Sequence, residues 1–464
     1  MDADKSGLIE TLNESPLSRF HYRAVLTAGM GFFTDAYDLF IIGAALVLIK
    51  AQWAPSKAMI GLLGSTALIA AFVGAFVFGR LADVLGRKKI YGLEAAIMGI
   101  GALASAFSPS VIWLLIFRFV MGIGIGGDYP VSAVLMSEYS NRKDRGKLVG
   151  LVFSMQALGL VAGPLVALTL LGSGIPGNIA WRLMLGLGAV PALAVVLLRR
   201  RMPESPRYTA LVQGNAQQAH DNLAKFSGSR VGLSTQDQQV SQLTFWQFIR
   251  NPKFLVTLIG TAGTWFLFDY AYYGNSISMP LVLKMVAPHA SAITSMGWSL
   301  LIFVVAAVPG YFLAVSKMDK IGHRKLQLIG FAFMGLAFGM IALIPNLTHM
   351  IVPFLLVFGA SYFFAEFGPN TTTFVLSSEL YPVSMRTTGH GISAGVAKLG
   401  AFIGVFVFPL LTKALGLNGT LLITFIFSIM GLLLTLLLPE PTGRTLESLA
   451  DDQVSLTTTR AVNS

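Results

Sequence analysis

Acidic side chains inside long apolar stretches are the first candidates for chemistry in this sequence. Asp35 and Asp38 lie three residues apart, and therefore on one face of a helix. Asp269 lies in a second stretch, where Trp265, Asp269 and Tyr273 recur every four residues and project to roughly one side. Ionisable side chains are costly in a lipid-spanning segment and are functional candidates by default. These residues therefore predict a binding site or a proton path.

A glycine-rich stretch contributes another acidic side chain. It reads Gly122-Ile-Gly-Ile-Gly-Gly-Asp128-Tyr129-Pro130. The glycines permit close approach of helices and Pro130 loosens the backbone ladder, but packing does not explain Asp128. Three polar residues of other apolar stretches join the candidates: Gln156, Asn370 and Lys398. A single buried amide often serves as an interhelical hydrogen bond worth about 1 kcal/mol, so its position must decide its role.

Membrane-spanning helices must position these residues. The chain has 464 residues, 54% of them apolar and 12% charged, which is too apolar for a soluble globular protein. We expect an all-α integral membrane protein with about twelve helices, each near the roughly 20 residues needed to cross a bilayer. The expected ranges are 23–49, 58–79, 90–107, 111–136, 147–172, 181–198, 254–283, 290–315, 326–344, 350–376, 389–412 and 420–438.

Charged motifs recur in the second half of the chain, which indicates a duplication. Gly79-Arg-Leu-Ala-Asp83-Val-Leu-Gly86-Arg87-Lys-Lys89 returns in reduced form as Lys317-Met-Asp319-Lys-Ile-Gly322-His-Arg324-Lys325. Ser137-Glu138 with Arg145 returns as Ser378-Glu379 with Arg386. The copies keep their order at nearly the same offset, so we expect two pseudo-symmetric six-helix halves.

Nearly the same offset pairs the polar residues of the membrane interior. Asp35 corresponds to Asp269, Tyr129 to Asn370, and Gln156 to Lys398. Transporters built from repeats bind their substrate at the interface of the repeats, near the middle of the bilayer. The matched pairs therefore predict one central site to which both halves contribute.

The basic residues predict the orientation of the chain. Of the 33 Lys and Arg residues, 26 share the loops and termini of one side. By the positive-inside rule we expect that side, with both termini, to be cytoplasmic in a plasma-membrane protein. The expected parts are an N-terminal half (1–198), a cytoplasmic linker (199–253) and a C-terminal half with a cytoplasmic tail (254–464). The linker is too short for an ordinary catalytic domain.

The loop motifs resemble those of the major facilitator superfamily, and Pro203-Glu-Ser-Pro-Arg207 and Pro439-Glu-Pro-Thr-Gly-Arg-Thr-Leu-Glu447 look like its sugar-porter branch. The resemblance covers the chain from its first span to its last and implies the major facilitator fold. It also implies that cytoplasmic charge pairs break when the transporter opens inward. The implied gate residues are Asp83, Arg87, Glu138, Arg145, Asp319, Arg324, Glu379 and Arg386.

The strings inside the spans are similar to those of the phosphate:proton symporter family. These are Thr34-Asp-Ala-Tyr-Asp38, Gly126-Gly-Asp-Tyr-Pro-Val-Ser-Ala133, Trp265 with Asp269 and Tyr273, and Lys398. The resemblance implies a phosphate pocket lined by Tyr129, Gln156, Trp265, Asp269, Tyr273, Asn370 and Lys398. It implies that Asp35, Asp38 and Asp128 serve the proton path, with Asp269 also coupled to protons. The linker is shorter than in fungal and plant members, so we expect a microbial source.

The chemistry of the implied pocket suits a phosphate anion. Phosphate offers several acceptor oxygens, for which the pocket has hydroxyl and amide donors, and Lys398 supplies the countercharge. Asp269 repels an anion unless it is protonated or accepts a phosphate hydroxyl. We therefore expect import of inorganic phosphate by proton symport through alternating access, driven by the proton gradient without a cofactor.

Several alternatives remain open from the residues. A proton-coupled symporter of an organic or aromatic acid or of a sugar would share the Asp35 and Asp38 pattern, although a sugar does not need Lys398. A nutrient sensor would need a longer cytoplasmic tail. The pattern of an enzyme is absent, and His323 and His390 are expected near helix ends at the surface. The basic residues behind the +11 net charge lie in the loops beside the membrane and form no continuous face, so nucleic-acid binding is not expected. We expect a monomer in the lipid bilayer. The chain has no cysteine and no metal cluster, so we expect no metal.

Overall fold

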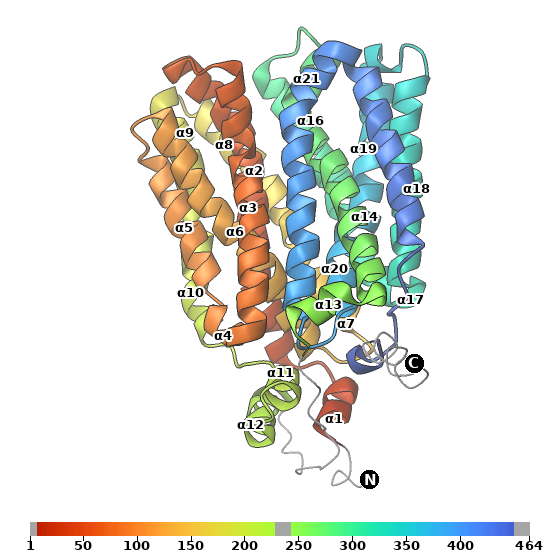
Figure 1. The fold of residues 1–464 in the computed structure, drawn as a ribbon. Helices are drawn as coiled ribbons and strands as arrows, with labels where there is room; N and C mark the ends of the chain where they lie inside the picture. The colour runs from red at the N-terminus through yellow and green to blue at the C-terminus, as the bar shows by residue number, and fades with distance from the viewer. Residues whose placement is uncertain (1–6, 228–242, 450–464) are drawn as a thin grey trace.

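The computed structural model describes residues 7–227 and 243–449, and these ranges fold into helices (Figure 1). The N-terminal half contains α1 (Leu8–Glu14), α2 (Arg19–Trp53), α3 (Lys57–Leu85), α4 (Arg87–Ile90), α5 (Leu93–Ala106), α6 (Val111–Tyr139), α7 (Arg145–Ser154), α8 (Gln156–Gly172), α9 (Gly177–Leu187) and α10 (Ala189–Arg200). The linker region contains α11 (Pro206–Leu211), α12 (Ala216–Ser227) and α13 (Phe245–Arg250). The C-terminal half contains α14 (Pro252–Ile277), α15 (Met279–Val286), α16 (Ala292–Ile302), η1 (Phe303–Ala307), α17 (Val308–Ile321), α18 (His323–Leu343), η2 (Leu347–His349), α19 (Ile351–Ala365), η3 (Glu366–Asn370), α20 (Thr371–Glu379) and α21 (Arg386–Thr435).

The described residues provide the helices expected for the membrane. Ten helical segments are long and apolar enough to cross a bilayer. One of them, α21, has 50 residues and is interrupted at Gly416, whose φ of 67° breaks the helix into two spans. The apolar helix α5 has 14 residues, which is short for a span, and it packs between α6 and α10. The all-helical class and the approximate number of helices predicted from the sequence are confirmed.

Several boundaries differ from the expected ranges. The first span runs over 35 residues, from Arg19 to Trp53, because its polar ends continue the helix beyond the apolar stretch. The expected span 254–283 ends at Ile277, where Ser278 and the following Pro280 start the separate helix α15. The fifth and sixth spans each contain a short irregularity, at Met155 and at Gly188. Hydropathy alone does not mark these positions.

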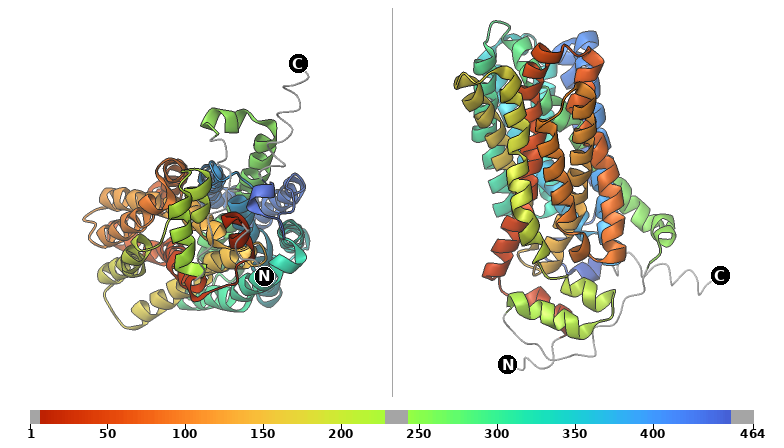
Figure 2. Two further views of the ribbon diagram at one scale, coloured as in Figure 1. Left: turned by 90° about the horizontal axis from the view of Figure 1, so that it is seen from below. Right: turned by 90° about the vertical axis from the view of Figure 1, so that its left-hand side faces the viewer.

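The two halves stand side by side as bundles of long helices, with the linker helices at one end (Figures 1 and 2). That end carries α1, α11 and α12 and is called the linker side below; the other end is called the opposite side. Contacts of α3 with α21 and of α7 with α17 join the halves. Helices α11, α12 and α13 of the expected linker lie outside the bundles, but its first residues belong to α10 and its last two to α14. Residues 228–242 and both chain ends lie outside the described ranges.

Non-α segments interrupt the C-terminal half beside its centre. A π-helical turn, η1, leads into α17, and a second one, η3, joins α19 to α20. Within η3, Gly368 has φ −119° and ψ −105°, and Pro369 follows it. Such insertions into the helical ladder occur preferentially at functional sites. They place Glu366 and Asn370 on the inner side of the bundle.

Glycines allow the helices of the N-terminal half to pack closely. A side chain at Gly126 of α6 would meet the carbonyl oxygen of Ala71 in α3, and one at Gly122 would meet that of Ala67. Both contacts involve backbone atoms, which cannot rotate away. The glycine-rich stretch is therefore a packing surface, as its composition suggested.

We predict that Gly126→Ala lowers the free energy of unfolding by about 1–3 kcal/mol, because the added methyl group forces α3 and α6 apart. Thermal unfolding of purified protein in detergent measures this loss. Gly297→Ala in α16 is the matched control, since no atom lies within 4 Å of the added group. Equal melting temperatures for the two variants would contradict the prediction.

Candidate functional site

Three polar side chains of the N-terminal half meet in the middle of the protein. The Tyr129 hydroxyl of α6 donates a hydrogen bond of 2.6 Å to Asp35 Oδ2 of α2. Gln156 Nε2, at the start of α8, donates to the same oxygen at 3.1 Å and to the Tyr129 hydroxyl at 3.0 Å. All three residues are at most 3% exposed. Asp35 thus lies in a buried polar cluster with two donors.

A hydrogen-bond chain continues from this cluster into the C-terminal half. The Tyr311 hydroxyl of α17 donates to Gln156 Oε1 at 3.1 Å. Asn370 Nδ2 donates to the Tyr311 oxygen at 2.8 Å and to Glu366 Oε2 at 2.5 Å. Asn370 was expected in the pocket from the sequence, whereas Tyr311 and Glu366 were not. Glu366 could have been found from the sequence, because it is a carboxylate in an otherwise apolar and aromatic stretch.

Lys398 supplies a positive charge at the same place. Its Nζ lies 3.1 Å from Asp269 Oδ2 and donates a second hydrogen bond of 3.1 Å to the Tyr273 hydroxyl. The ammonium group also lies 4.5 Å from the centroid of the Tyr129 ring, so it contacts both halves. The Trp265 ring is 5.9 Å from that of Tyr129. The structure therefore brings together the seven residues of the expected pocket, with Asp35 beside them.

Aromatic rings cover this polar cluster on its linker side. Phe153 of α7 stacks on Phe374 of α20, with 4.4 Å between the centroids. Phe32 of α2 contacts both of these rings and that of Tyr129 at 5.0–5.5 Å. Because these rings come from both halves, they separate the polar cluster from the charged groups on the linker side.

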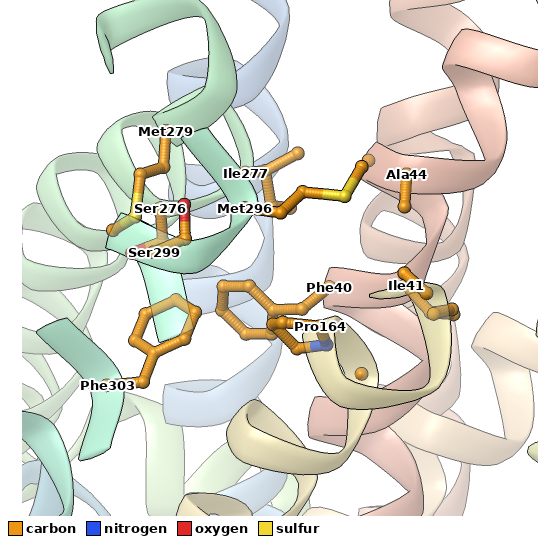
Figure 3. A pocket seen from close by; sticks show the side chains of 13 residues that line it. Phe40, Ile41, Ala44, Pro164, Ser276, Ile277, Met279, Met296, Ser299 and Phe303 are labelled. Atoms are coloured by element: carbon orange, nitrogen blue, oxygen red, sulfur yellow. The ribbon is translucent and has the colours of Figure 1, made fainter. Parts of the chain in front are cut away.

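A second aromatic layer lies toward the opposite side. Phe40 of α2 stacks near Tyr273, at 6.2 Å, and contacts Phe303 of η1 at 5.7 Å. Beyond these rings lies a cavity of about 50 Å³ between the halves, which has room for a few water molecules (Figure 3). Its lining is mainly apolar and includes Met279, Met296 and Pro164. The central cluster is thus enclosed between two aromatic layers.

Two expected proton-path residues lie apart from the central cluster. Asp128 forms a bidentate pair with Arg199, with Nη1–Oδ1 at 2.6 Å and Nη2–Oδ2 at 2.9 Å. The same guanidinium lies 2.9 Å from Glu94, and Ser132 donates to Asp128 at 2.5 Å. The sequence analysis placed Arg199 just beyond the end of a span and missed Glu94. The structure shows one buried charge cluster within the N-terminal half.

Asp38 also faces away from the central cluster. It lies against Gly188, at the break between α9 and α10, where a side chain on that glycine would collide with the carboxylate. Arg118 of α6 is the basic residue that faces it. The neighbouring Tyr37 hydroxyl donates to the Met184 carbonyl oxygen at 2.7 Å. Of the carboxylates in the expected proton path, Asp35 and Asp269 therefore lie in the central cluster, whereas Asp38 and Asp128 lie deeper in the N-terminal half.

Charge pairs between the halves close the linker side in a two-fold pattern. Arg145 of the N-terminal half binds Glu379 of the C-terminal half, with Nε–Oε1 at 3.0 Å. Arg386 of the C-terminal half binds Glu138 of the N-terminal half at 2.9 Å. Arg87 adds a contact of 3.1 Å to Glu138. Each repeated arginine thus pairs with the repeated glutamate of the other half.

Two aspartates reinforce this closure through backbone groups. Asp83, at the end of α3, accepts hydrogen bonds from the Thr388 backbone N–H and hydroxyl in the first turn of α21, both at 2.7 Å. Asp319, at the end of α17, accepts from the Lys147 N–H in the first turn of α7 at 2.7 Å. A carboxylate at a helix N-terminus also interacts favourably with the helix dipole. Each half therefore caps a helix of the other.

The Arg324 guanidinium donates to the Leu436 carbonyl oxygen within the same half at 2.9 Å, so its role in the gate stays a prediction. Two expectations about histidines are wrong. His323 is not a surface residue, since it is 1% exposed and lies 3.2 Å from Asp319 and 3.5 Å from Glu379. His390 is fully buried beside the Trp265 ring. A position near a helix end gave no indication of burial, because neighbouring helices cover these ends.

The two proline-containing motifs after the sixth and twelfth spans contact each other. Arg207 of the first motif binds Glu447 of the second at 2.9 Å. Burial raises the pKa of Glu447, but the positive charges of Arg207 and Arg386 outweigh this effect and hold it below its usual value. Glu204 accepts a hydrogen bond from the Lys88 N–H in the first turn of α4. Glu440 accepts from the N–H groups of His323 and Arg324 in the first turn of α18. The motifs thus tie the linker-side loops together.

Known proteins are similar to this sequence over most of its length. Residues 24–452 match the sequence family described as sugar (and other) transporter. The chain belongs to this transporter family. A probable inorganic phosphate transporter 1-6 of Arabidopsis thaliana is 35% identical, and the alignment covers 97% of each chain. Inorganic phosphate transporter 1-6 of Oryza sativa subsp. japonica is 34% identical over 96% of this chain and 95% of that protein.

Solved structures show the same architecture. The major facilitator superfamily proton:xylose symporter XylE, bound to 6-bromo-6-deoxy-D-glucose, has a TM-score of 0.78 at 20% identity, covering 93% of this chain and 98% of that one. The expected major facilitator fold and a multi-pass membrane transporter are therefore confirmed. The relatives named here are plant proteins, which gives no support to the expected microbial source. Among the described residues, no group of three or more His, Cys, Asp or Glu could hold a metal ion.

We predict strong coupling between Asp128 and Arg199 in stability. Asp128→Asn or Arg199→Gln alone leaves a buried charge with fewer partners, at a loss of about 3–5 kcal/mol. The double variant should lose less than the sum, with a coupling energy of about 1–3 kcal/mol. Thermal unfolding in detergent of the unmodified protein, the two single variants and the double variant gives this coupling energy as a double-mutant cycle. Additive losses would show that the pair does not act as one unit.

We also predict that breaking the Arg145–Glu379 pair opens the linker side. The chain has no cysteine, so Ser378→Cys introduces a single thiol at a position that is fully buried. Adding Arg145→Gln should raise the rate at which a polar maleimide labels this thiol several-fold, because the closed state loses an inter-half charge pair.

Lys143→Gln in the same loop is the matched control, since it removes an exposed positive charge. It should leave labelling of the Ser378→Cys thiol unchanged. Equal labelling rates with and without Arg145→Gln would mean that the pair does not hold the gate.

Proposed function

We propose that this protein imports inorganic phosphate together with protons by alternating access. The observation that carries the proposal is the buried Lys398 ammonium group, at the contact of the two halves, against the Tyr273 hydroxyl and the ring of Tyr129. Phosphate needs such a countercharge and several donors. Full-length relatives named as inorganic phosphate transporters support this choice of substrate.

Proton coupling follows from the way Lys398 is neutralised. In this structure its charge is balanced by Asp269 at 3.1 Å, and Asp35 faces it from the other half. A phosphate anion that takes over Lys398 leaves these carboxylates beside a second negative charge, which is unfavourable unless protons bind as well. Binding of phosphate and binding of protons therefore favour each other.

The gate residues give the conformational part of the cycle. The linker side is held shut by the Arg145–Glu379 and Arg386–Glu138 pairs and by the caps of Asp83 and Asp319. We propose that loading of the central site lets these contacts separate and the halves rock about it. Loss of protons toward the linker side then weakens phosphate binding and releases the anion.

The orientation and assembly complete the proposal. The linker side carries the excess of basic residues and is therefore taken as cytoplasmic, in the plasma membrane. The central site is built from one chain, so a monomer in the lipid bilayer suffices, and the proton gradient replaces any cofactor or enzymatic step. Arsenate or another small anion could use the same donors, so competition experiments must fix the selectivity.

A sugar is the second candidate substrate. The solved proton:xylose symporter shares the fold at 20% identity, and the family name includes sugars. The buried lysine argues against it, since a neutral sugar gains little from a charge that costs several kcal/mol to bury. Competition between labelled phosphate and unlabelled xylose decides between the two.

We predict that purified protein in liposomes accumulates labelled phosphate when the outside is more acidic than the inside, and that a protonophore stops accumulation. Lys398→Gln should abolish uptake because the anion loses its countercharge.

Asp269→Asn should abolish proton-driven accumulation. Lys413→Gln is the matched control, since this lysine is exposed on the opposite side, and it should transport normally. Uptake that ignores the protonophore, or that survives Lys398→Gln, would refute the proposed function.

A further inference from the structure

Glu366 is a buried carboxylate that the sequence-based site does not include. It lies in the π-helical segment η3 and is fully buried. Its Oε2 accepts the hydrogen bond from Asn370, whereas no donor meets its Oε1 with good hydrogen-bond geometry, although the Tyr272 and Tyr311 hydroxyl groups lie near the carboxyl group. Glu366 therefore contacts a residue of the expected phosphate pocket, and its polar neighbours are neutral.

Within the described part of the chain, no positively charged group is a neighbour of Glu366. Its titratable neighbours are tyrosines: Tyr272 from α14, Tyr311 from α17 and Tyr362 from α19. From α18, Gly330 approaches the backbone of the same segment at Gly368 and brings no polar side chain. Three phenols and one amide can donate hydrogen bonds, but none of them balances a negative charge.

This environment is unique among the buried carboxylates of the described residues. The others each face a basic group. The facing groups are Lys398 for Asp35 and Asp269, Arg118 for Asp38, Arg87 for Asp83 and Glu204, Arg199 for Glu94 and Asp128, Arg87 and Arg386 for Glu138, and Arg145 for Glu379. A charge buried without a partner is strongly unfavourable, and such a group takes up a proton instead.

We propose that Glu366 is an additional proton-binding site of this transporter, which holds a proton on Oε1 in the present conformation and exchanges it during the cycle. The inference rests on the proposed function for its link to phosphate, but proton binding at Glu366 is independent of the substrate. The neutral form fits the all-phenol surroundings. The charged form becomes favourable when the halves separate and water or a cation reaches Oε1.

The hydrogen bonds of Glu366 connect its proton to the central site. A charged Glu366 holds Asn370 Nδ2 tightly, because a hydrogen bond to a carboxylate is stronger than one to a neutral acid. A protonated Glu366 still accepts from Asn370, as in the present structure, but more weakly, so that an anion beside Lys398 can draw the amide away. Tyr311 and Gln156 extend the chain to Asp35. Asn370 and Gln156 are amides, which do not readily relay a proton. Glu366 therefore influences Asp35 by changing how these side chains are oriented.

The first test does not depend on phosphate. Purified protein in nanodiscs is studied by infrared difference spectroscopy, in which a protonated carboxyl group gives its own C=O stretching band. Glu366→Gln should lose one such band at neutral pH, and Glu14→Gln, which changes an exposed carboxylate, should lose none. An unchanged set of protonated-carboxyl bands in Glu366→Gln overturns the proposal. Should that variant fail to fold, Glu366→Asp must shift the band, and an unshifted band is equally decisive.

The second test measures coupling in liposomes. Glu366→Gln imitates the protonated acid, so it should retain phosphate exchange across the membrane while losing part of the proton uptake per phosphate and part of the pH dependence. Wild-type proton uptake and pH dependence in this variant would overturn the coupling role. If the unmodified protein carries no phosphate at all, the proposed function fails, and the infrared test still decides on Glu366.

Discussion

The need to neutralise every buried charge controls this structure. An isolated ion in a low-dielectric interior is so unfavourable that it must find an opposite charge or change its protonation state. Most buried carboxylates of the described chain solve the problem with a basic partner, and several of those partners belong to the other half of the molecule. The halves are thus joined where they neutralise each other, at the centre and on the linker side. Transport requires that these same contacts be exchanged for contacts with a cargo, with protons or with water.

Lys398 is the residue on which this exchange depends. In the present structure it satisfies Asp269 and Tyr273 and lies over the ring of Tyr129. An anion can replace a carboxylate as its partner without leaving the ammonium group uncompensated. The two aromatic layers, with Phe153 and Phe374 on one side and Phe40 and Phe303 on the other, keep the exchange away from bulk water. Electrostatic interactions within such an enclosure are stronger than in water.

Sequence reasoning reached the fold and most of the central cluster, for reasons that particular residues make clear. The apolar stretches and the repeated loop motifs carry the architecture directly. Correspondence between the halves brought out Asp35 with Asp269 and Gln156 with Lys398, because a duplication leaves polar residues at matching depths. It could not find Tyr311, whose hydroxyl is one of many in aromatic stretches, or separate Asp128 from the central cluster. That separation depends on Arg199, which approaches Asp128 only after the last span of the half packs against the others.

The caps made by Asp83 and Asp319 have a consequence for how the closed state tolerates sequence change. Each aspartate holds backbone N–H groups of the opposing half, and every residue type except proline offers such a group. A substitution at Lys147 or Thr388 therefore keeps the backbone part of the contact, whereas each aspartate has a fixed length and charge. The side chain of Lys147 can therefore change with little effect on the contact, whereas Thr388 adds a hydroxyl hydrogen bond and Gly146 leaves no room for a side chain beside Asp319. On the donor side of each contact the peptide backbone supplies the hydrogen bond. On the acceptor side the contact depends on a single aspartate.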